Sequence, residues 1–313
     1  CWSRTRTSPL TGSGLSASAT AGETLTWNLG YSLGTPWVQT QGGDVVIRDK
    51  VWSLMTSLAS PRLFSVNGEG GYPGGVFYGS TGVSPYDFDA GSGNGGSYVS
   101  STNWLVNDQG EGFSDDPLVR DWYKYFLYTF DLSPLANPTP DYNFPLMNTI
   151  TKPTRPSKQT LPYTYLVQGN METDGDWTIG ASETIIFLVS GNATIKGKIT
   201  ITPGGFFALI AQGNILVDPT VGVPYTSSTP VVEGIYITSP TGSFQTGTSL
   251  VGTERFVGKG SFIAGSFLLQ RDLSSVGRNA ETSAELFLYN PQLLYTMPAK
   301  MKEMKINWRE VAP

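Results

Sequence analysis

The sequence predicts an all-β fold: a mainly parallel, right-handed β-solenoid with coils of about 22 residues, a small helix-containing insertion and a C-terminal cap. Three observations support this fold class. A Gly-Asn pair recurs at equal spacing, strand-like segments alternate apolar and polar residues, and turn-forming residues are frequent. The 313 residues include 37 Gly and 21 Pro, which suits many short strands joined by tight turns.

The repeat is clearest between residues 165 and 221. The two intervals between successive Gly-Asn pairs are both 22 residues, and the pairs are Gly169-Asn170, Gly191-Asn192 and Gly213-Asn214. Apolar residues keep the same register before and after the pairs, in the columns Tyr165/Phe187/Leu209, Thr173/Ile195/Val217 and Trp177/Ile199/Val221. We expect the pairs to form stacked corners, with the Asn side chains in a ladder. An antiparallel β-meander with a coincidental spacing is the alternative.

The segment 193–202 (ATIKGKITIT) is typical of one coil. Ile195, Ile199 and Ile201 fall on one face, and Thr and Lys residues fall on the other. The column Asp174/Lys196/Asp218 would place opposite charges on neighbouring strands.

Taken in order, the chain divides into five predicted segments. These are an N-terminal extended segment (1–34), the first solenoid coils (35–86), a Gly- and Pro-rich insertion with one helix at about 117–130 (87–162), the main solenoid (163–283) and the cap (284–313). The segment 232–237, in which Gly234 follows Gly213 by 21 residues, is interpreted as part of a less regular coil beside this core. The solenoid therefore starts before residue 50, pauses, and resumes near residue 163.

The helix of the insertion is predicted from its capping pattern. Asp116 is the expected N-cap and Pro117 the first helical residue, followed by an apolar face that includes Trp122 and Phe126. Two predicted strands, 184–189 and 206–211, are apolar on both faces, so their outer face needs a cover. The insertion helix is the first candidate for that cover and a neighbouring subunit is the second.

The C-terminal segment is expected to close the last coil, because a solenoid otherwise exposes an edge. The core-closing residues are predicted to be Leu286, Leu288, Leu293, Leu294 and Tyr295. The basic residues that follow, Lys300, Lys302, Lys305 and Arg309, are interpreted as a solvated surface rather than a docking surface for an acidic partner.

Composition excludes several classes of function. The chain has no His, one Cys and a net charge of −5, so it has no Ser-His-Asp triad, no His-ligated metal, no internal disulfide and no basic surface for nucleic acid. No apolar run approaches the ~18 residues that suggest a transmembrane segment. Low charge and abundant Ser, Thr and Gly favour an extracellular protein. Cys1 has two readings: a lipid-modified N-terminal Cys, or a chain start or intermolecular link without lipid.

Carboxylates are the acid-base groups that remain for catalysis. Most acidic residues lie outside the regular coils and cluster in the insertion. No pair of carboxylates is predicted to converge on one face of a coil. Four of them, Asp87, Asp89, Asp108 and Glu111, could bind calcium through turn oxygens, but neither stretch has a full calcium loop. Loop solvation is the preferred interpretation, and no cofactor is predicted.

Six motifs resemble a group of uncharacterised cell-surface β-solenoid proteins of candidate-phyla bacteria (Patescibacteria, Microgenomates-like). They are 37–44 (WVQTQGGD), 70–79 (GGYPGGVFYG), 213–222 (GNILVDPTVG), 234–236 (GIY), 268–273 (LLQRDL) and 308–313 (WREVAP). The resemblance implies an exported protein at the bacterial cell surface and a longer parent chain. It carries over no catalytic residue.

These observations predict a non-catalytic extracellular structural protein, a self-associating subunit of a bacterial surface filament, layer or stalk used in attachment. Such a protein forms a homo-oligomer or polymer and binds no nucleic acid. A carbohydrate-active β-helix enzyme that uses carboxylates, as a polysaccharide lyase or hydrolase, is the first alternative. A glycan-binding or calcium-dependent adhesin is the second.

Overall fold

A computed structural model describes four longer stretches of the chain and several short strands. The longer stretches are residues 121–130, 149–152, 163–247 and 254–302, and the short strands lie at 3–5, 17–18, 38–41, 45–47, 76–78, 106–107 and 143–145. Several residues for which the sequence supports a prediction lie outside the described residues. They are Cys1, Asp87, Asp89, Asp108, Glu111, Lys305 and Arg309.

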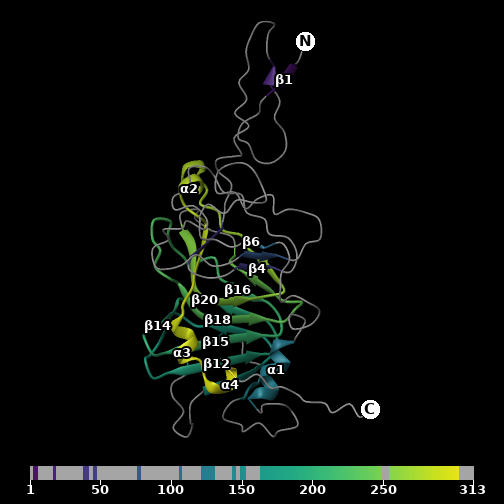
Figure 1. Cartoon of the computed structure of the whole chain (residues 1–313), viewed down its shortest axis with the longest axis vertical. Helices are drawn as coiled ribbons and strands as arrows, with labels where there is room; N and C mark the ends of the chain where they lie inside the picture. Colours follow the sequence, from purple (N-terminus) through teal and green to yellow (C-terminus); the bar gives the residue numbers. More distant parts are fainter. Residues whose placement is uncertain are drawn as a thin grey trace, which may run out of the picture.

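Parallel strands stack one above another along the longest axis of the molecule, which confirms the predicted β-solenoid (Figure 1). The main sheet has 11 strands, eight of them in the order β3-β22-β20-β18-β15-β12-β9-β7. The bounds along this path are β3 Val38–Gln41, β22 Glu285–Leu288, β20 Glu254–Ile263, β18 Val232–Thr238, β15 Phe206–Ala211, β12 Thr184–Val189, β9 Tyr163–Gln168 and β7 Asn143–Pro145.

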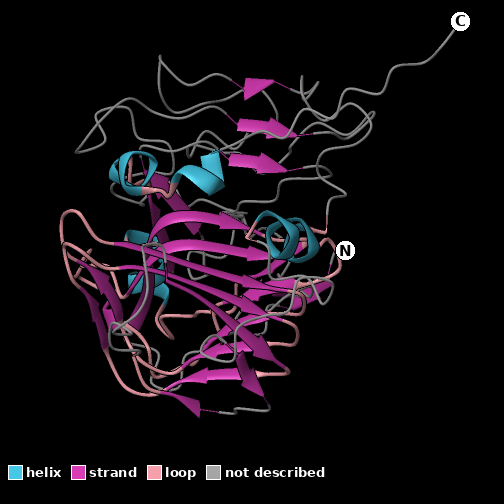
Figure 2. Ribbon diagram, turned by 90° about the horizontal axis from the view of Figure 1, so that it is seen from below, coloured by secondary structure: helices cyan, strands magenta, loops and turns pink. Residues whose placement is uncertain are grey.

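Two further faces complete each coil, as the view along the stack shows (Figure 2). The corner sheet has six strands, β21 Ser266–Leu268, β19 Ser243–Gln245, β16 Ile215–Val217, β13 Ala193–Ile195, β10 Met171–Thr173 and β8 Thr149–Ile150, in that order. The third face comprises β11 Trp177–Ile179 and β14 Ile199–Ile201, and β17 Val223–Pro224 pairs antiparallel with β20.

The remaining described elements lie outside these three faces. Strands β1 Ser3–Thr5 and β2 Ala17–Ser18 form an antiparallel pair, and β4 Val45–Ile47, β5 Val76–Tyr78 and β6 Val106–Asn107 form a parallel sheet. The helices are α1 Trp122–Thr129, α2 Val276–Glu281, α3 Gln292–Thr296 and α4 Ala299–Lys302.

The predicted 22-residue register holds for the first coils. Phe187 lies between Tyr165 and Leu209, and these side chains form one buried inward column with Tyr236. The later coils are longer than 22 residues. The pairings of Leu209 with Tyr236 and of Phe256 with Glu285 show this. The column Trp177/Ile199/Val221 is correct only for its first two members, since Ile199 pairs with Val232.

The lengthening also places the fourth corner beyond Gly234. Gly234 is a strand residue with φ +136, and its position faces Phe207 of β15 rather than Gly213. The residue that lies against the carbonyl of Gly213 is Gly242, 29 positions later, and Gly265 follows it in the same column. The segment 232–237 therefore continues the solenoid as predicted, as part of strand β18, and the corner lies further along the chain.

Helix α1 covers the outer face of the main sheet, as predicted. Its Tyr123, Phe126 and Phe130 are buried in one apolar cluster with outward side chains of β12 and β15, such as Ile186 and Ile210. The helix begins later than predicted, because Asp121 is the N-cap and accepts a hydrogen bond from the backbone N–H of Lys124. Asp116 and Pro117 precede the described residues of this helix.

The predicted cap differs from the structure in two respects. Its first segment, β22, is another rung of the main sheet, and β3 from the N-terminal part of the chain pairs beyond it in parallel. Leu286 is buried in the core as expected, whereas Leu294 and Tyr295 of α3 are exposed rather than core-closing. Leu293 turns inward from α3 instead and joins the cluster beneath α1.

We expect Gly197→Ala to lower the free energy of unfolding by about 2–4 kcal/mol. A Cβ at this position would overlap the backbone carbonyl of Gly175 in the coil below, so the two coils could not keep their separation. Chemical denaturation measures the change. Gly277→Ala in α2 is the matched control, because its Cβ would make only an ordinary contact, with Ser275 Oγ at 4.0 Å, and we expect it to change stability by less than about 1 kcal/mol. Equal effects of the two substitutions would contradict this explanation.

Candidate functional site

The predicted Asn ladder is present at the corners. The side-chain oxygen of Asn170 accepts from the backbone N–H of Asn192 at 2.9 Å, and that of Asn192 accepts from Asn214 N–H at 2.8 Å. Asn214 in turn accepts from the N–H and hydroxyl of Ser243 at 2.8 and 3.0 Å. Gly191 and Gly213 lie too close to the preceding coil for a side chain. The residues of the repeat thus hold successive coils together.

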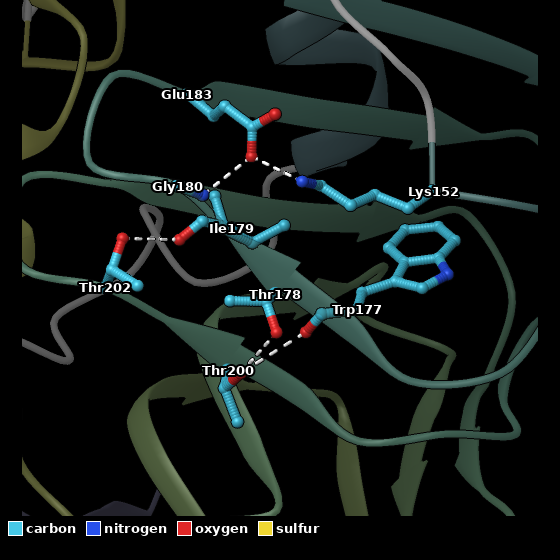
Figure 3. Close-up of polar contacts among 8 residues, drawn as sticks. All are labelled: Lys152, Trp177, Thr178, Ile179, Gly180, Glu183, Thr200 and Thr202. Atoms are coloured by element: carbon cyan, nitrogen blue, oxygen red, sulfur yellow. Dashed lines mark hydrogen bonds and ion pairs between the residues drawn. The ribbon is translucent and has the colours of Figure 1, made fainter.

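Carboxylates on the coil surface are also used within the fold. Glu183 Oε2 accepts from the backbone N–H of Gly180 and from Lys152 Nζ, both at 2.6 Å (Figure 3). These bonds, against the opposing effect of burial, lower the pKa of Glu183. Nearby, the hydroxyl of Thr202 donates to the carbonyl of Ile179 at 2.9 Å. The strands and turns shown in Figure 3 are therefore held together by local polar contacts.

Other acids repeat this pattern. Lys196 Nζ lies 2.7 Å from Glu172 Oε2, so the predicted column of charges pairs Lys196 with Glu172 rather than with Asp174. Asp176 accepts from the backbone N–H of Lys198 at 2.7 Å. Within residues 121–130, 149–152, 163–247 and 254–302 and the short strands, no group of three or more His, Cys, Asp or Glu side chains could hold a metal ion.

The last coils contain a cluster of buried charged side chains. Arg271 donates from Nε to the carbonyl of Thr246 at 2.8 Å and from Nη1 to that of Pro219 at 2.8 Å. Its Nη2 donates to the carbonyls of Asp218 and Val221 at 3.2 and 3.0 Å. The hydrogen bonds of this one side chain hold the loop after β16 in place. At this loop the coils become longer than 22 residues.

Glu285 is the carboxylate of this cluster. Its Oε1 accepts from the Thr246 hydroxyl at 2.9 Å and from the backbone N–H of Arg271 at 2.8 Å. Burial raises the pKa of Glu285 to about 7, and these two bonds and the charges of Arg271 and Arg255 only partly offset it. Burial likewise lowers the pKa of Arg255 to about 10.

The cluster extends to the N-terminal strand. Arg255 Nη2 donates to the hydroxyl of Ser283, and Ser283 donates to Gln39 Oε1 of β3 at 3.3 Å. Gln39, Ser283 and Glu285 are all buried. The arrangement can tie β3 to the last coil, and it lacks the exposed converging groups that a catalytic site needs.

The same end of the solenoid presents apolar side chains to solvent. Phe267 of β21 continues the inward column Met171/Ala193/Ile215/Phe244, whose other members are at most 1 % exposed, yet Phe267 is 40 % exposed. Its ring lies 6.1 Å from that of Phe244. We call this surface, made by Ile263, Phe267 and Leu268, the open end.

The open end also includes the terminal strand of a sheet. Strand β21 terminates the corner sheet, and among the strands that the structure describes only β19 pairs with it. An edge strand with exposed apolar side chains is a template for another strand. The open end therefore combines exposed apolar side chains with a sheet edge that has no second partner among the described strands.

Comparison with known proteins identifies no relative: no family model, no curated protein and no solved structure matches this chain. None of the helices within the described ranges is long and apolar enough to cross a membrane.

Sequence reasoning found the corners but missed the cluster and the open end. The spacing of Gly213, Gly242 and Gly265 was a usable signal, provided that coils of unequal length were allowed. Glu285 and Arg271 gave no signal, because their partners lie up to 53 positions away in the chain.

We expect Glu285 to make the protein less stable as pH rises from about 4.5 to about 7. Its pKa in the folded protein is higher than the ordinary value, so the protonated form stabilises the fold below pH 4.5 and this stabilisation is lost as the pH passes about 7. A shift of this size corresponds to up to about 3 kcal/mol. Chemical denaturation of wild type and Glu285→Gln at pH 5 and pH 8 measures it.

Gln retains the oxygen that accepts from Thr246 and Arg271, so the variant separates charge from hydrogen bonding. Its stability should fall less than that of wild type between the two pH values. An identical pH dependence in both proteins would exclude Glu285 as the cause.

Proposed function

We propose that this chain is a non-catalytic structural protein that self-associates, serving as a subunit of an extracellular filament, layer or stalk. The single observation that carries the proposal is Phe267, a core-column residue that is 40 % exposed on the terminal strand of the corner sheet. Apolar surface of this kind is stabilised by a partner that removes it from water.

The geometry of the coils supports end-to-end association. The corner sheet ends at β21 on one side and at β8 on the other, and its strands are parallel throughout. A second copy that added its rung to β21 would continue the sheet at the ordinary strand spacing of ~4.8 Å. Contact between two different surfaces of identical chains propagates into an open assembly unless the rotation closes a ring.

The described acids favour this function over catalysis. Glu172, Glu183 and Asp176 are engaged in ion pairs or backbone hydrogen bonds that hold coils together, and Glu285 is buried. A polysaccharide lyase or hydrolase needs carboxylates that converge on an accessible substrate. Release of reducing ends from a panel of polysaccharides would overturn the structural proposal, and a calcium-dependent melting temperature would favour an adhesin.

We expect Phe267→Lys to weaken self-association by at least about tenfold, because it places a charge in the apolar contact. Sedimentation velocity over a concentration series measures the apparent dissociation constant, and electron microscopy shows whether fibres or layers form. Thr178→Lys is the control, since Thr178 is exposed on the third face, away from β21. A wild-type protein that stays monomeric at the highest concentration would refute the proposal.

A further inference from the structure

Strand β3 is a rung of the main sheet that comes from a remote part of the chain. It pairs in parallel with β22, from Val38 against Glu285 to Gln41 against Leu288. The hydrogen bond from Ser283 to Gln39 joins residues 244 positions apart. The last coil is therefore completed by a segment that does not adjoin it in sequence.

The end of the solenoid requires this rung. Without β3 the edge of β22 would be open, and Ser283, a residue of the buried charged cluster that is 1 % exposed, would lose its hydrogen bond to Gln39. Uncovering a buried charged cluster and a strand edge together is unfavourable. A strand with the sequence of β3 must therefore occupy this position in any stable state.

Nothing in the pairing requires that the strand come from the same chain. Roughly 100 residues separate Gln41 from β7, the next strand of the main sheet along the chain, and the effective concentration of an intramolecular partner falls as the connection lengthens. Another copy presents an identical strand to an identical edge. When copies are concentrated in one place, the intermolecular pairing competes with the intramolecular one.

We propose that β3 is exchanged between copies, so that β3 of one chain pairs with β22 of the next. The inference rests on the self-association proposed above and names its partner and contact. The exchanged strand lies two rungs beyond β20, the strand that leads into β21, so both surfaces belong to the same end of the solenoid. Reciprocal exchange produces closed dimers, and sequential exchange produces a polymer.

Cysteine crosslinking tests the exchange directly. Two single variants are made in a Cys1→Ser background, Gln41→Cys and Leu288→Cys, because these positions face each other and both are half-buried. The two proteins are unfolded, mixed, refolded together over a concentration series and oxidised. Non-reducing electrophoresis and mass spectrometry of the linked peptides then identify which positions are joined.

We expect a crosslinked dimer between the two variants that rises with protein concentration and exceeds a control mixture several-fold. The control replaces Leu288→Cys by Thr178→Cys, an exposed position on the third face that reports random collision. The double variant Gln41→Cys/Leu288→Cys should change from intrachain to interchain disulfides over the same series. Thr40→Cys with Phe287→Cys, the adjacent facing pair, replaces the first pair if circular dichroism shows that the first does not fold.

A mixture that crosslinks no more than its control, with only intrachain disulfides in the double variant, would overturn the exchange. Light scattering of wild-type protein at the same concentrations distinguishes the two proposals. Association without exchange would leave the open end as the contact and remove β3 from it. Absence of association would refute the proposed function itself.

Discussion

The rest of the structure depends on the close approach of one coil's backbone to the next. Hydrogen bonds between parallel strands hold successive coils at a fixed spacing, and at the corners this leaves no room for a side chain. Gly191, Gly197 and Gly213 meet the carbonyl groups of the coil below, and Asn side chains complete the bonding there. The inward columns of large apolar residues pack only because these corners keep the coils in register.

Where the chain repeats faithfully, its sequence was sufficient to predict the fold. The column of Tyr165 and Phe187, the Asn ladder and the covering helix were all recovered from spacing and apolar pattern. Beyond Val217 the loops change length, so the 22-residue spacing no longer locates the corners, and Gly242 rather than Gly234 lies against Gly213. Tyr295 was assigned to the core for its apolar character alone, but the geometry of α3 turns only Leu293 inward.

The candidate site was less predictable than the fold, because it depends on contacts between distant segments. Arg271 binds carbonyl groups of a loop 50 or more positions earlier, and β3 pairs with a strand that follows it by more than 240. Parallel pairing leaves no local turn motif that would identify its partner. The exposure of Phe267 likewise follows from its place at the end of a column, and residue type alone would have placed it in the core.

The position of β3 also determines the order of events during biosynthesis. Val38 to Gln41 leave the ribosome early, but their partner strand at Glu285 is made only when the chain is nearly complete. Contacts of such long sequence separation form slowly. The nascent chain therefore carries an unpaired strand through almost its whole synthesis, and chaperones or an export pathway that keeps the chain extended would protect it until the final coil exists.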